Sequence, residues 1–260
     1  MQRISSGLAV SLLALLVGCG GGDGSAPAST GSGSTASSDA LVVSAAASLT
    51  EAFEAYGAES PGEVRFSFAG SDDLAAQIRQ GAKPDVYAAA STAYPEALNA
   101  EGLVEPPVVF ARNELVIAVG PDSDIDSIED LAAPGLDLVV GAAGVPVGDY
   151  TRAVLDRLPA AERTAIVANV RSAESDVKGI VGKVAQGAAD AGFVYSSDVA
   201  AAPEDLEAIT LPPHLGPDVS YGIAVVVGAA DPEAAQAFVD GLLDGAGSQA
   251  LLDAGFRPPR

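Results

Sequence analysis

Two serines stand where short apolar runs give way to segments of helical spacing. Ser48 follows Ala45-Ala46-Ala47, and Ser71 follows Phe68-Ala69-Gly70. In an open α/β sheet, ligands bind beyond the carboxyl ends of strands, where helix N-termini present N–H groups without partners. Small residues at such a point let a ligand approach the backbone closely. The alternative is that each serine is an ordinary helix cap, with Ser48 and Glu51 forming a capping box.

Three further segments offer similar donors. The glycine-bracketed loop 144–150 opens a helix, and Gly148 in it would tolerate close approach of a ligand. Asp176-Val177-Lys178 stands near the start of another helix, and Tyr195 ends an apolar run. A tyrosine in that position can also be half-buried packing. No Arg, Lys or His is conspicuous beside these hydroxyl and N–H groups, so a bound anion would be held by neutral dipoles. A fully deprotonated tetrahedral oxyanion suits such a site.

These segments belong to an alternation of β-branched runs and Ala-rich stretches, which indicates βα units and parallel sheet. The predicted strands are Leu41–Ala45, Glu63–Phe68, Asp85–Ala89, Leu115–Val119, Leu138–Gly141, Ile166–Val170, Ala191–Tyr195 and Ile223–Val227. The predicted helices are Leu49–Ala58, Asp72–Gln80, Tyr94–Ala100, Asp149–Leu158, Ser175–Gln186 and Pro232–Leu243.

The composition narrows the possible functions. The 260 residues are enough for two modest lobes, and 48% of them are hydrophobic, which indicates a globular chain. Thirteen Lys and Arg against 35 Asp and Glu give a net charge of -22, which argues against binding to nucleic acid or to an anionic membrane surface. One Cys and one His exclude zinc sites, iron–sulfur clusters, Cys/His nucleophile pairs and intramolecular disulfides.

The amino terminus has the layout of a secretory signal peptide over residues 1–18. Arg3 precedes an apolar run, Leu8–Val17, and Leu16-Val17-Gly18-Cys19 follows, which resembles the lipobox of bacterial lipoproteins. We expect cleavage before Cys19 and a lipid on its sulfur. Residues 19–39 would then be the lipidated Cys and a flexible Gly/Ser linker. The alternative is a free Cys near the end of an uncleaved anchor, but the run is shorter than a spanning helix requires.

The ordered set of motifs from about residue 41 to 260 resembles the molybdate-binding proteins of bacterial ABC importers. The motifs are A-A-A-S-L-T at 45–50, F-A-G-S at 68–71, L-A-A-Q-I at 74–78, G-A-K-P-D-V-Y at 81–87, A-R-N-E-L-V-I at 111–117, V-P-V-G-D-Y at 145–150 and A-G-F-V-Y-S-S-D at 191–198. Each motif is weak alone, and their order and spacing are specific.

The resemblance implies an α/β, two-lobed class II periplasmic-binding fold. Each lobe would be a mostly parallel sheet flanked by helices, with two chain crossovers and the ligand cleft between the lobes. We place lobe 1 at residues 40–113 plus 222–260 and lobe 2 at 114–221, with hinge strands near Asn113–Val119 and Asp218–Ile223.

The resemblance also implies five ligand positions: Ser48, Ser71, Val147, Val177 and Tyr195. The serines would donate hydroxyl and backbone N–H groups, the valines backbone N–H groups, and the tyrosine its phenolic O–H. Two positions depart from the family. Val147 stands where Ala is common, and its isopropyl group could tighten the pocket. Asp72 stands where Ser is frequent, so its carboxylate must point away from an anion.

The implied function is that of a solute-binding protein outside the cytoplasmic membrane, anchored through Cys19. It would capture molybdate or tungstate and deliver it to a membrane permease, as a monomer, without a cofactor, without a free metal cation and without catalysis. The alternatives are another oxyanion such as sulfate, a scaffolding lipoprotein, or a serine hydrolase, for which Ser175 and Lys178 match S-x-x-K. Two observations argue against a hydrolase. The sequence lacks the S-D-N and K-T-G motifs that accompany S-x-x-K in such enzymes, and its lone histidine, His214, lies in an irregular loop unsuited to a catalytic base.

Overall fold

The strands of the described chain form two five-stranded sheets. The computed structural model describes residues 40–259, which lie within a compact unit of residues 38–260. The predicted signal peptide, the lipidation site at Cys19 and the linker to residue 39 lie outside the described residues. None of the described helices is long and apolar enough to cross a membrane.

The first sheet contains one reversed strand. Its strands are β1 (Leu41–Ala46), β2 (Val64–Ala69), β3 (Val86–Ala89), β4 (Val108–Asn113) and β10 (Val219–Val225). Their order is β2-β1-β3-β10-β4. Strand β1 pairs in parallel with β2 and β3, whereas β10 is antiparallel to both β3 and β4. The other four strands therefore run in one direction.

The second sheet repeats this plan. Its strands are β5 (Leu115–Val119), β6 (Leu138–Gly141), β7 (Val170–Glu174), β8 (Ala191–Tyr195) and β9 (Glu207–Thr210), in the order β7-β6-β8-β5-β9. Strand β6 is parallel to β7 and β8, and β5 is antiparallel to β8 and β9. Only β5 is reversed, so the expectation of two mostly parallel sheets is confirmed.

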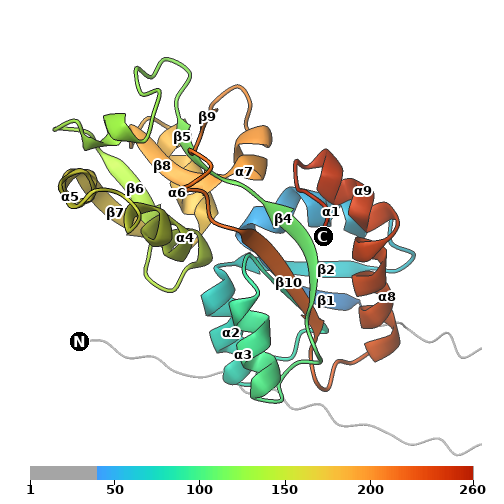
Figure 1. The fold of residues 1–260 in the computed structure, drawn as a ribbon. Coiled ribbons are helices and arrows are strands. Elements are labelled where there is room, and N and C mark those ends of the chain that lie inside the picture. Colours follow the sequence, from blue (N-terminus) through green and yellow to red (C-terminus); the bar gives the residue numbers. More distant parts are fainter. Residues whose placement is uncertain (1–39, 260) are drawn as a thin grey trace, which may run out of the picture. The chain divides into compact units, whose positions relative to one another are not determined.

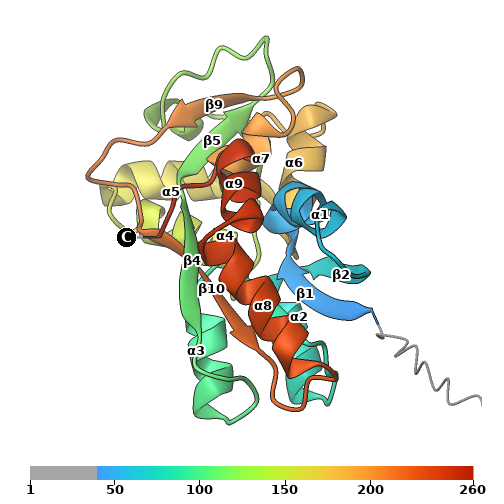
Figure 2. The same cartoon turned by 90° about the vertical axis from the view of Figure 1, so that its right-hand side faces the viewer.

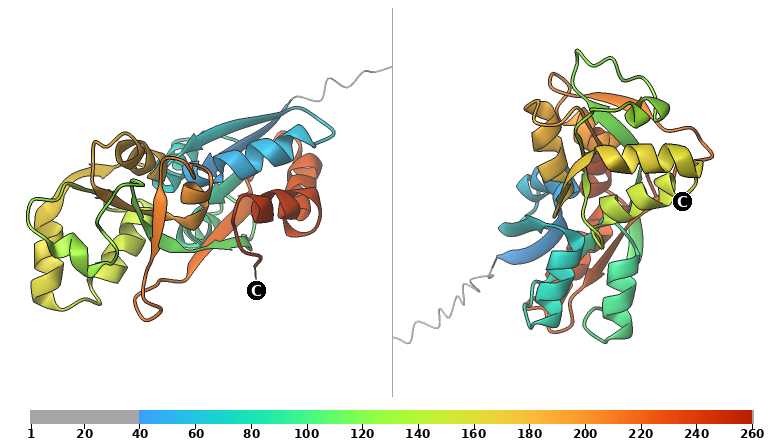
Figure 3. Two further views of the ribbon diagram at one scale, coloured as in Figure 1. Left: turned by 90° about the horizontal axis from the view of Figure 1, so that it is seen from above. Right: turned by 90° about the vertical axis from the view of Figure 1, so that its left-hand side faces the viewer.

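Helices cover both faces of each sheet. Around the first sheet lie α1 (Thr50–Ala58), α2 (Ser71–Arg79), α3 (Ala93–Ala100), α8 (Pro232–Leu243) and α9 (Ala246–Asp253). Helices α2 and α3 lie together on one side, and α8 and α9 lie on the other, in front of β10 when seen in Figure 2. Around the second sheet lie α4 (Pro146–Leu155), α5 (Ala160–Asn169), α6 (Val177–Ala185) and α7 (Ser196–Ala200), with α4 and α5 in front in the right panel of Figure 3.

The chain passes between the sheets twice (Figure 1). It leaves the first sheet at the end of β4 and enters the second at β5 after a single residue, Glu114. It returns between β9 and β10, across residues 211–218. The two crossovers implied by the resemblance are therefore present. Strand β10 begins at Val219, so the first sheet takes up residues shortly before the lobe boundary predicted at 222.

Several predicted elements need correction. Ile166–Val170 is not a strand, because α5 continues to Asn169 and β7 begins at Val170. Ile166 and Asn169 are buried whereas Val167 is 52% exposed, which is helical spacing, and periodicity cannot separate the two in a short apolar run. The helix predicted at Asp149–Leu158 begins earlier, at Pro146. The strand predicted at Ile223–Val227 is Val219–Val225.

Candidate functional site

A small cavity lies between the two sheets, where the first turns of several helices meet. Its volume is about 10 Å³, roughly the room that one water-sized sphere needs. The cavity is lined by Ala46, Ala47, Ser48, Ala69, Gly70, Ser71, Ala90, Val145, Pro146, Val147, Asp176, Val177 and Tyr195. All five residues to which the resemblance points are therefore brought together around one cavity. Its lining contains no Arg, Lys or His.

Ser48 comes from the turn after β1, and its role differs from a helix cap. It lies inside a 3₁₀ helix, Ala47–Leu49, whose N-cap residue is Ala46, and α1 follows without a side-chain cap. The capping box predicted for Ser48 and Glu51 is therefore wrong. The Ser48 Oγ instead lies 2.9 Å from the hydroxyl of Tyr221 in a buried hydrogen bond. Tyr221 on β10 thus fixes the Ser48 hydroxyl beside the cavity.

Ser71 is the first residue of α2, so its expected capping role is also wrong. The N-cap residue is Gly70, and no side chain caps this helix. The Ser71 Oγ accepts a hydrogen bond from the backbone N–H of Ala90 at 3.1 Å, and the Ser71 carbonyl accepts one from the Tyr87 hydroxyl at 2.7 Å. Because the oxygen accepts from Ala90, its own O–H remains free to donate to a ligand.

Val147 lies in the first turn of α4, directly after Pro146. Proline suits the first helical position, since that N–H would have no partner within the helix, and the N–H of Val147 belongs to the same unpaired first turn. This end of α4 sits against β6 so closely that a Cβ on Gly148 would lie 2.3 Å from the Ala142 carbonyl oxygen. The Val147 Cγ1 lies 2.7 Å from where a Cβ on Gly141 would be. Its isopropyl group therefore packs toward β6.

Val177 is the first residue of α6, and the preceding acid caps this helix. The Asp176 side chain accepts a hydrogen bond from the Gly179 N–H at 2.9 Å. Asp176, which belongs to the predicted run at this helix start, also lines the cavity. Asp72, whose carboxylate must point away from a bound anion, is not among the residues that line the cavity. Its Oδ1 is enclosed in the protein without a hydrogen-bond partner among residues 40–259, and burial raises the pKa of Asp72.

Tyr195 ends β8 and is the N-cap residue of α7. Its ring is buried between the rings of Tyr150 and Tyr221 and meets both edge to face. The distances between ring centroids are 6.5 Å to Tyr150 and 5.8 Å to Tyr221. Its hydroxyl is buried and has no hydrogen-bond partner within the described part of the chain. Burial raises the pKa of Tyr195 well above 10, so the hydroxyl keeps its proton. Such a group is a donor that a ligand in the cavity can use, since burying it unpaired is costly.

The geometry suits binding of an anion better than catalysis. First turns of α2, α4 and α6 and the 3₁₀ turn at Ser48 converge on the cavity, and helix N-termini favour negative charge. Lys178 of the S-x-x-K pattern does not act as a free amine beside Ser175, because its ammonium pairs with Glu51 and Asp198. Among residues 40–259, no group of three or more His, Cys, Asp or Glu side chains could hold a metal ion.

Comparison with known proteins agrees with this arrangement. Residues 41–257 match the family model described as bacterial extracellular solute-binding protein. The chain belongs to this family. As a solute-binding protein it acts outside the cytoplasm by binding, which confirms the expectation that it is not an enzyme.

This solute-binding protein has relatives of similar length. It is 39% identical over 265 residues, 98% of each chain, to the molybdate-binding protein ModA of Mycobacterium tuberculosis. Among solved structures, the substrate-binding domain of a putative molybdenum ABC transporter from Clostridium difficile has a TM-score of 0.65 and 27% identity, covering 85% of this chain and 99% of that one. The periplasmic molybdate-binding protein of Azotobacter vinelandii has a TM-score of 0.76 at 20% identity, covering 85% and 100%, and confirms the two-lobed fold.

Proposed function

We propose that this solute-binding protein captures molybdate or tungstate and delivers it to the permease of an ABC importer. The observation that carries the proposal is the buried, protonated hydroxyl of Tyr195, which has no hydrogen-bond partner among residues 40–259 and lies beside a cavity whose lining has no cationic side chain. Sequence relatives named as molybdate-binding proteins, at 29% and 39% identity, support the choice of ligand.

The cavity favours a small dianion over an organic solute. Hydroxyls of Ser48, Ser71 and Tyr195 and the N–H groups of Val147 and Val177 would donate to its oxygens. Each such bond to a charged acceptor is stronger than a neutral one. Tungstate is nearly the size of molybdate, so we expect the two to bind about equally. Sulfate is smaller and would leave donors unsatisfied.

We infer that the lobes close over the anion by bending at the two crossovers. Residues 40–113 with 219–260, which build the first sheet, would form one lobe and residues 114–218 the other, with the hinge at Glu114 and the 211–218 segment. Ser48 and Ser71 would hold the anion first, and the second lobe would then bring Val147, Val177 and Tyr195 onto it. The closed monomer would dock on the permease, whose ATPase lies on the cytoplasmic side.

The proposal includes a lipid anchor. Cleavage of residues 1–18 would expose Cys19 for lipidation, and residues 20–39 would tether the binding body to the membrane surface. Changing Cys19→Ser should move the processed protein from the detergent phase to the aqueous phase in phase partitioning. A variant that partitions as the unchanged protein does would contradict the anchor.

Thermal unfolding of the chain from Ser38, the start of the compact unit, tests the choice of ligand. A ligand that binds only the folded state raises the melting temperature. We expect molybdate and tungstate to raise it, and sulfate and phosphate to leave it near the ligand-free value. A rise with sulfate alone would keep the solute-binding role and replace the cargo. No shift with any oxyanion would contradict the proposal.

A further inference from the structure

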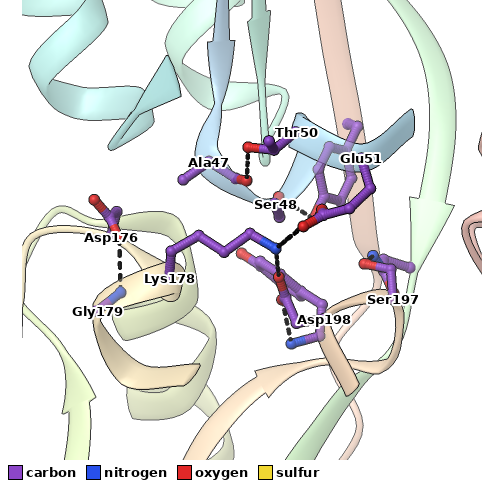
Figure 4. A network of polar contacts seen from close by, with 12 residues as sticks. Ala47, Ser48, Thr50, Glu51, Asp176, Lys178, Gly179, Ser197 and Asp198 are labelled. Carbon is purple, nitrogen blue, oxygen red and sulfur yellow. Dashed lines mark hydrogen bonds and ion pairs between the residues drawn. The ribbon is translucent and has the colours of Figure 1, made fainter. Parts of the chain in front are cut away.

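An ion pair joins the two lobes one residue away from Val177, which lines the cavity. Lys178 is the second residue of α6, directly after Val177, and its Nζ lies 2.8 and 3.0 Å from the two carboxylate oxygens of Glu51 on α1. Figure 4 shows the Lys178 side chain reaching across from α6 to both Glu51 and Asp198. Because α1 packs with the first sheet and α6 with the second, this contact exists only when the lobes lie together.

The same ammonium faces a buried carboxylate. Asp198 of α7 is 1% exposed, and its Oδ1 lies 3.5 Å from the Lys178 Nζ without a hydrogen-bond partner among residues 40–259. Its Oδ2 accepts a hydrogen bond from the Tyr195 backbone N–H at 3.1 Å. Burial raises the pKa of Asp198 to about 7, and the positive charge of Lys178 opposes this rise. Lys178 therefore helps to keep Asp198 ionised.

Each of the three helices that meet at Lys178 begins at or just after a proposed ligand residue. Helix α6 begins with Val177, α1 follows the turn that holds Ser48, and α7 begins after Tyr195. A contact among these elements therefore bears on the positions of three of the donors. An interaction made only in the closed state also shifts the equilibrium toward that state and slows ligand release.

We propose that Lys178 is a latch that retains the bound anion, by pairing with Glu51 across the closed lobes and with Asp198 behind Tyr195. The latch rests on the proposed function, since it acts on the anion held between the lobes. Lys178 is a positioning residue here, because its ammonium binds carboxylates and does not line the cavity.

The test is the dissociation rate of molybdate from the purified chain, measured by stopped flow at several salt concentrations. Glu51→Gln removes the pairing partner on the other lobe. Its carboxylate is 48% exposed, so we expect release to speed up roughly two- to fivefold, as for other exposed pairs. Lys178→Met, which also leaves Asp198 without its cation, should speed release further, about tenfold. The double variant should release no faster than Lys178→Met alone.

Lys183→Met is the matched control. Lys183 lies on the same helix, and its Nζ pairs with Glu174 of the same lobe at 2.5 Å and with Ser172 at 2.9 Å. This change removes an equal charge without touching the contact between lobes, so the release rate should stay at the value of the unchanged protein. Added salt should speed release from the unchanged protein and from Lys183→Met, and have little effect on Glu51→Gln, because screening weakens the latch.

The outcomes separate the latch from the proposed function. Molybdate binding by the unchanged protein, with equal release rates for Glu51→Gln and Lys183→Met, would overturn the latch and leave the proposed function standing. Faster release from Glu51→Gln, with an unchanged ligand-free melting temperature and lost salt dependence, supports the latch. An unchanged protein that binds no oxyanion would overturn both.

Discussion

Tyr195 is the residue on which the site depends most. Ser48 and Ser71 already have protein partners in Tyr221 and Ala90, whereas the Tyr195 hydroxyl has none among the described residues. A polar group that is buried without a partner destabilises the folded state and is available to a ligand. In the proposed function, the same hydroxyl would therefore link a cost in the ligand-free protein to affinity in the complex.

Tyr195→Phe separates these two effects. It removes the unpaired hydroxyl and keeps the ring between Tyr150 and Tyr221, so the ligand-free melting temperature should stay the same or rise. Loss of one hydrogen bond to a charged ligand should weaken molybdate binding by roughly 10- to 100-fold, from about 1.5–3 kcal/mol. Calorimetry measures the affinity. Unchanged binding would remove Tyr195 from the site.

Asp198 predicts a dependence of stability on pH. An unfolded aspartate titrates near 3.9, whereas burial raises the pKa of Asp198 to about 7 in the folded chain. Between these values the folded state binds a proton that the unfolded state has released. The contribution of Asp198 to the free energy of unfolding is therefore largest below about pH 4 and falls as the pH rises to 7.

Asp198→Asn should remove this contribution, since an amide can still accept from the Tyr195 N–H but does not titrate. Denaturant unfolding between pH 4 and pH 8 should show a flatter pH profile for Asp198→Asn than for the unchanged chain. The exposed Asp253→Asn is the control and should follow the unchanged chain. A parallel profile for Asp198→Asn would contradict the assignment.

At the scale of elements, the N-termini of several helices converge on the candidate site. They come so close to the opposite lobe that one position has no room for a side chain. Gly70, the N-cap residue of α2, lies so close to the other lobe that a Cβ there would be 2.4 Å from the Ser175 carbonyl oxygen. Its backbone angles, φ -58° and ψ 138°, are open to any residue. The glycine is therefore required by the contact between lobes, and not by its own conformation.

Gly70→Ala should hinder closure without unfolding either lobe. We expect molybdate affinity to fall more than about tenfold, as a loss of over 1.4 kcal/mol, while the ligand-free melting temperature changes little. Gly62→Ala is a suitable control, because a Cβ at that position would meet nothing within 4 Å. If Gly70→Ala binds as tightly as Gly62→Ala, the contact between Gly70 and Ser175 does not form on closure.

Helices and strands could be predicted where a short stretch of sequence carries a clear pattern, and were missed where it does not. The strand-to-helix junctions at Ser48 and Ser71 and the strand end at Tyr195 were found because apolar runs end there in small or polar residues. The edge strands β4 and β9 and the helices α5, α7 and α9 were missed, since short runs carry little periodicity. The roles of Tyr221 and Gly70 depend on contacts between distant segments, for which a single sequence offers no local sign.

At the scale of the molecule, two lobes of one plan are joined by two crossovers, and the functional contacts lie across them. Lys178 meets Glu51, Gly70 meets Ser175, and the Tyr94 hydroxyl donates to the Gly144 carbonyl. Each of these contacts joins the two lobes, so all three form only when the lobes lie together.

A crystal structure of the chain grown with molybdate, with anomalous diffraction measured at the molybdenum absorption edge, tests the central claim most directly. The account predicts one strong anomalous peak between the lobes, with oxygens bonded to Ser48, Ser71, Val147, Val177 and Tyr195. A peak elsewhere on the protein, or none between the lobes in a complex shown to bind molybdate in solution, would contradict it.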